Sequence, residues 1–157
     1  MGIHRAAHTE AQSLTSRAIS ATVHCLTGCA IGEILGMVIA TALGWGNVAS
    51  IFLSVVLAFL FGYSLTIRPV LRAGLPFRRA ARVAVASDTA SIATMELVDN
   101  AFILLVPGAL AAGLATGLFW WSLGVSLVIA FIVTVPVNRW LIARGRGHAV
   151  MHLYHEH

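Results

Sequence analysis

Four carboxylic acids stand inside strongly apolar stretches of this 157-residue chain, which has six acidic residues in all. They are Glu33, Asp88, Glu96 and Asp99. A carboxylate at the middle of a bilayer costs at least about 2.5 kcal/mol on insertion scales, and acids retained there are typical of ion pathways and proton relays. The pattern therefore predicts a cation or proton site within a membrane-spanning helix bundle.

Two thiols share a helical face with the first of these acids. Cys25, Cys29 and Glu33 follow one another at four-residue intervals, and His24 stands at the edge of the same face. Thiolate and imidazole are soft and borderline ligands, which favour Cu(I) or Zn(II). We predict transition-metal ligands here. Membrane thiol redox chemistry is a weaker alternative, because an i, i+4 cysteine pair forms a disulfide only with helix distortion.

The later acids form a second polar face on another helix. Asp88, Met95, Glu96 and Asp99 fall within an arc of about 140° when about 100° is allowed per residue. The first and third helices of a bundle run in the same direction across the membrane, so the two faces would form a ladder of ligands if they meet. Glu96 is then expected at the depth of Glu33. The alternative is structural: protonated carboxyls that hydrogen-bond to one another between helices.

The chain ends in a histidine-rich segment. His148, His152 and His155 have the i, i+4, i+7 spacing of one helical face, which could hold a borderline metal. The alternative is a solvated tail that binds nothing.

Composition decides the fold class: 59% of residues are hydrophobic, 10% are charged, and mean hydropathy is +0.88. Four apolar runs are long enough to cross a bilayer. They are Ile19 to Leu43, Ala49 to Ile67, Ala80 to Val106 and Leu118 to Ile142. We predict an all-α polytopic membrane protein, a bundle of four transmembrane helices over residues 19–143. A cytoplasmic segment (1–18) without a removable signal peptide precedes it, and the His-rich tail (144–157) follows.

Positive charge predicts the orientation. The ten basic residues are all arginines, and they fall near the N-terminus, around the junction of the second and third runs, and from the end of the fourth run to the C-terminus. The other two loops carry none, so the positive-inside rule places both termini in the cytoplasm. Topology and contact with the lipid bilayer explain the net charge of +4, and no nucleic-acid partner is expected.

Three glycines on the first run indicate close helix packing. Gly28, Gly32 and Gly36 recur every four residues, which lets another backbone approach closely. Because four helices are few for a gated pathway, we expect a homo-oligomer through this face. The glycine and ligand faces overlap, so either the site lies between subunits or the glycines pack against the third helix of one subunit.

Three separated motifs carry a resemblance to a known family. They are the stretch His24 to Glu33, the acidic helix Asp88 to Asn100, and the ending Asn138 to Ala149. Together they resemble an uncharacterised bacterial membrane family known as domain of unknown function number four-three-nine-six. The resemblance extends from about Val23 to His155. It implies a four-helix bacterial membrane protein and supplies no activity.

These features lead to one functional expectation and one alternative. We expect a multi-pass protein of the bacterial inner membrane that binds and translocates a transition-metal cation, Cu(I) or Zn(II). No nucleotide loop, catalytic triad or haem motif is visible in the sequence, so an enzyme is not expected. The alternative is a non-catalytic accessory or assembly subunit of a larger membrane complex, in which the buried acids are structural.

Overall fold

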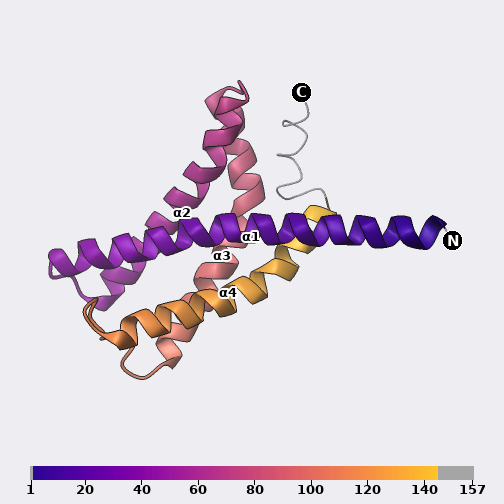
Figure 1. Cartoon of the computed structure of the whole chain (residues 1–157). Coiled ribbons are helices and arrows are strands. Elements are labelled where there is room, and N and C mark those ends of the chain that lie inside the picture. Colours follow the sequence, from indigo (N-terminus) through magenta and orange to yellow (C-terminus); the bar gives the residue numbers. More distant parts are fainter. Residues whose placement is uncertain (1, 145–157) are drawn as a thin grey trace.

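The computed structural model describes the backbone of residues 2–144 and the side chains of residues 13–144, and this part folds as four α-helices (Figure 1). They are α1 (Gly2–Ala42), α2 (Asn47–Arg72), α3 (Phe77–Leu105) and α4 (Gly117–Ala143). The all-α, four-helix prediction is confirmed. Helix α1 begins much earlier than hydropathy predicts, because the polar residues before Ile19 continue the same helix.

Among the described residues, three helices are long and apolar enough to cross a membrane: Ser13–Ala42 of α1, α2 and α4. Helix α3, the third of the four predicted spans, is not one of them. Helix α3 carries the acids, but its 29 residues extend about 43 Å, and Asp88, Glu96 and Asp99 are all buried inside the bundle. Large apolar side chains face outward instead, and both Leu97 of α3 and Ile132 of α4 are more than half exposed. This distribution is the one that a lipid solvent requires.

Helix α1 lies at the centre of the packing. It contacts each of the other three helices, and α3 also packs against α2 and α4. Figure 1 shows α1 running across the other helices. The turn between α2 and α3 lies far from the connection between α3 and α4. In that hairpin turn Gly74 has a φ of +85°, and Pro76 caps the start of α3.

Small residues bring α1 and α2 into backbone contact. The facing pairs are Gly28 with Gly62, Gly32 with Ala58, and Gly36 with Ser54. A Cβ atom added to Gly28 would lie 2.7 Å from the Gly62 Cα, and one added to Gly32 would lie 2.5 Å from the Ala58 Cα. No second helix can approach this face while α2 occupies it.

This packing corrects two expectations from the sequence. The face of Gly28, Gly32 and Gly36 is filled by α2 of the same chain, so it is not an interface between subunits. Its partner inside the chain is α2 and not the third helix. Oligomerisation through another surface stays a prediction.

Candidate functional site

A buried seam of thiols and carboxyls runs between α1 and α3. On α1 its members are four residues apart, and on α3 they are separated by eight and then three residues. Both spacings keep the side chains on the side where the two helices touch. The members are Cys25, Cys29 and Glu33 on α1, and Asp88, Glu96 and Asp99 on α3, and all six are buried. The structure therefore brings together the two polar faces that the sequence predicts.

The seam is ordered in successive levels along the helices. The Cys25 thiol lies beside Ser91 at the level nearest Asp88, and one turn further along α1 the Cys29 thiol lies against the Glu96 carboxyl. The next turn places the carboxyl of Glu33 beside that of Asp99. The rise in number on both helices shows that they run in the same direction. The register differs from the expected one, because Asp99 and not Glu96 is the direct partner of Glu33.

Hydroxyl groups surround the Asp88 end of the seam. Ser87 donates a hydrogen bond of 2.7 Å to the Asp88 carboxyl, and Thr66 of α2 also lies beside that carboxyl. The His24 ring reaches the same Thr66, with 3.2 Å between Nε2 and Oγ1. His24 thus belongs to a cluster with Asp88 and Thr66 and lies at the edge of the thiol stripe, as its position in the sequence indicates.

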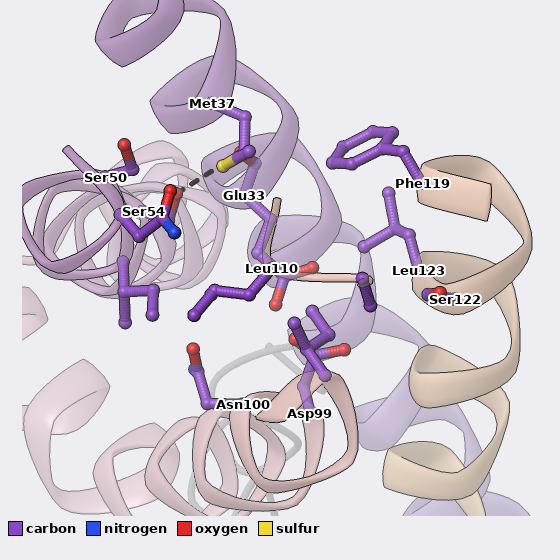
Figure 2. A pocket seen from close by; sticks show the side chains of 14 residues that line it. Glu33, Met37, Ser50, Ser54, Asp99, Asn100, Leu110, Phe119, Ser122 and Leu123 are labelled. Carbon is purple, nitrogen blue, oxygen red and sulfur yellow. Dashed lines mark hydrogen bonds between the residues drawn. The ribbon is translucent and has the colours of Figure 1, made fainter. Parts of the chain in front are cut away.

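The Glu33 end opens into a cavity of about 60 Å³ (Figure 2). Glu33, Asp99 and Asn100 line it from α1 and α3, and Figure 2 shows these three side chains directed toward the same space. The Ser126 hydroxyl of α4 donates a hydrogen bond to Asp99 Oδ1. The Asn100 amide donates to the Glu96 backbone carbonyl over 2.8 Å, and this bond fixes the turn of α3 that carries Glu96 and Asp99.

Several buried carboxylate oxygens have no hydrogen-bond donor among the described residues. They are Glu33 Oε2, Glu96 Oε1 and Asp99 Oδ2. A buried oxygen atom of this kind costs free energy unless a proton, a cation or a water molecule satisfies it. The seam therefore has the capacity to bind further positive charge.

The predicted metal ligands do not form one coordination shell. Within residues 13–144, no three His, Cys, Asp or Glu side chains converge closely enough to hold a metal ion. Met95 is buried in the apolar core with Cys25 and Cys29, where it packs against Ile92. The tail residues His148, His152 and His155 lie outside the described residues. The expected ligand set is thus spread along a seam rather than gathered at a point.

Sequence reasoning missed two threonines that support the seam. Thr22 accepts a hydrogen bond of 2.9 Å from the Asn138 amide, which also donates to Ser91 over 3.0 Å. Thr66 joins His24 and Asp88. A signal exists for Thr66, which continues a four-residue stripe of small residues that begins at Ser50 on α2, whereas Thr22 has only Ala18 beside it at that spacing before Leu26. That spacing identifies a face but not the helix it meets.

An all-α bundle with an apolar outer surface and a buried acidic seam is a small helical membrane protein with a polar interior. The chain belongs to the family described as domain of unknown function DUF4396, and the match covers residues 15–147, which confirms the resemblance. No curated protein and no solved structure matches the chain.

Proposed function

We propose that this protein is a multi-pass protein of a bacterial inner membrane that translocates a cation. The cation is the proton, which moves along the seam between α1 and α3. The observation that carries the proposal is a row of three buried carboxyls, each with one oxygen that has no donor among the described residues, at Glu33, Glu96 and Asp99. In a membrane interior such groups are costly to retain unless they bind protons or cations.

The spacing of the seam favours protons as the moving species within one chain. Neighbouring levels are about 6 Å apart along α1, and Glu96 and Asp99 are less than one turn apart on α3, so single water molecules or hydroxyl groups can bridge the levels at the Glu33 end. Asp88 lies about 12 Å before Glu96 along α3, so several such groups in series are needed there. Ser126 at Asp99 and Ser91 beside Cys25 supply such hydroxyls. A relay needs only pairwise contacts, whereas a metal site needs several ligands to converge.

The arginines support an orientation for this pathway. Those at the α2–α3 turn and near the end of α4 are exposed, and both groups follow an even-numbered helix, so they would lie on one side of the membrane if all four helices cross it. We infer that this side, with both termini, is the cytoplasmic one. The cavity at Glu33 and Asp99 would then open toward the outer side of the membrane.

Proton flux into proteoliposomes tests the proposal. Purified protein would be reconstituted with a trapped pH-sensitive dye, and a potassium diffusion potential would drive protons inward. We expect the Glu96→Gln variant, which keeps the side-chain shape, to lower the flux at least tenfold. Glu10→Gln is the matched control, because Glu10 lies on α1 about six turns before Glu33. Its proton flux should equal that of the unmodified protein. Flux equal to that of empty liposomes, or unchanged in Glu96→Gln, would overturn the proposal.

A second candidate is translocation of Cu(I) or Zn(II), which the two buried thiols against seam carboxyls favour. In this case a second chain or the tail would complete the ligand set. Elemental analysis of the full chain after equilibration with each metal tests it. Near-stoichiometric metal that is lost in a Cys25→Ser/Cys29→Ser variant supports this candidate, and metal content that the double variant leaves unchanged opposes it.

A further inference from the structure

The cavity at the Glu33 end has the size of a binding site for a small ion, and two carboxyls stand in its largely apolar wall. Its volume of about 60 Å³ accommodates a few water molecules, since one water needs roughly 10–15 Å³. Glu33 and Asp99 border it on one side, with Asn100 next to them, and Ser50 and Ser54 of α2 border it on another (Figure 2).

Two buried carboxyl groups border the cavity and lie within hydrogen-bonding reach of each other. Glu33 is 6% exposed and Asp99 is 2% exposed, and apart from that mutual contact neither Glu33 Oε2 nor Asp99 Oδ2 accepts a hydrogen bond from a described residue. The other oxygen of Asp99 is held by Ser126, so this carboxyl has a fixed orientation. Two carboxylates side by side repel one another, and positive charge between them removes the repulsion.

The donor atoms around the cavity select the class of ion. Carboxylate, amide and hydroxyl oxygens are hard ligands, which suit Mg²⁺, Mn²⁺ and Ca²⁺. Soft ligands are fewer here. Met37 supplies one thioether to the lining, and the thiol of Cys29 lies four residues before Glu33 on α1, outside the lining. Two carboxylates also match the charge of a divalent ion.

We propose that this cavity binds one hard divalent cation between Glu33 and Asp99, with Asn100 and water completing its oxygen ligands. The inference deepens the proposed function, on which its physiological meaning rests. A cation at this place would occupy the outermost pair of the seam and compete with protons for the same oxygens. Binding itself is measurable without any flux.

Electron paramagnetic resonance with Mn²⁺ as the probe tests the site, because bound Mn²⁺ loses the sharp signal of the free ion. Full-length protein in detergent should bind about one Mn²⁺ per chain, and added Mg²⁺ or Ca²⁺ should displace it. We expect Glu33→Gln and Asp99→Asn each to weaken binding at least tenfold. Glu10→Gln should bind as the unmodified protein does. Elution profile and thermal transition report whether each variant is folded. If Asp99→Asn does not fold, the result for Glu33→Gln alone tests the site.

The outcomes separate this site from the proton relay. No Mn²⁺ binding, or binding that both carboxyl variants leave unchanged, overturns the site. Proton flux without Mn²⁺ binding would leave the relay intact and remove the cation site. Mn²⁺ binding at Glu33 and Asp99 without flux would support the site and remove the relay.

Discussion

Helix α1 has two contact faces built on the same four-residue spacing, and they differ in nearly every other respect. Toward α2 it presents Gly28, Gly32 and Gly36, and the helix backbones touch. Toward α3 it presents Cys25, Cys29 and Glu33, and thiols and carboxyls fill the space between the helices.

The difference separates packing from chemistry. Without a hydrophobic driving force between helices in lipid, close backbone approach supplies dispersion and holds α1 against α2. The α3 face contains buried carboxyl oxygens without donors among the described residues, and these reduce stability unless a proton, a cation or a water molecule satisfies them. One face stabilises the bundle, and the other carries its proposed activity.

The largest effect is expected at the glycine face. A Gly32→Leu substitution forces side-chain atoms into the α2 backbone at Ala58, which cannot move without displacing the helix. We expect a loss of about 3 kcal/mol in the free energy of unfolding, seen as a lower thermal transition and a poorer yield of monodisperse protein. Gly124→Leu on α4 is the control, because nothing lies within 4 Å of a Cβ atom there. Equal losses in both variants would contradict close packing of α1 on α2.

A smaller effect is expected where α4 closes the polar side. Asn138→Leu removes hydrogen bonds to Thr22 and Ser91 and leaves both hydroxyls without that donor. Such bonds within membranes contribute about 0.6 kcal/mol each, so we expect a loss of about 1 kcal/mol in unfolding free energy.

The control for Asn138 lies one turn away on the same helix. Thr134 is buried, and its hydroxyl has no hydrogen-bond partner among the described residues, so Thr134→Val removes no bond of this kind. We expect its stability to be unchanged or slightly higher. Denaturant titration in detergent measures both variants, and a larger loss for Thr134→Val would oppose the hydrogen-bond account.

The smallest effect is expected at the edge of the α2–α3 contact. The Tyr63 hydroxyl and Thr89 Oγ1 are hydrogen-bonded over 2.8 Å at an exposed position. Tyr63→Phe should lower the unfolding free energy by about 0.5 kcal/mol and leave proton flux and Mn²⁺ binding unchanged, because the bond lies away from the seam. A marked loss of flux would extend the functional region beyond the α1–α3 seam.

Local signals in the sequence predict most of the helices. Apolar run length and the breaks at glycine and proline place α2, α3 and α4 within a few residues of their observed bounds. They fail at the start of α1, because the polar helical segment before Ile19 leaves no trace in hydropathy. Helical periodicity also predicts which acids and thiols share a face.

Periodicity does not predict which faces meet. Helices α1, α2, α3 and α4 all carry small residues at four-residue spacing, so the sequence offers several partners for the glycines, and the expected partners were wrong. It also assigns depth only approximately, since the axial offset between α1 and α3 depends on how all four helices pack. Glu33 consequently meets Asp99 one turn beyond the expected Glu96.

By itself, then, the sequence determined that the chain forms apolar helices whose acids and thiols lie on polar faces, because hydropathy and the helical repeat are properties of the local chain. Only the tertiary structure decided that α2 covers the glycines, that Ser126 orients Asp99, and that a cavity forms beside Glu33. The physical reason is that contacts between helices depend on shape and offset summed over the whole bundle, which no single stretch of sequence encodes.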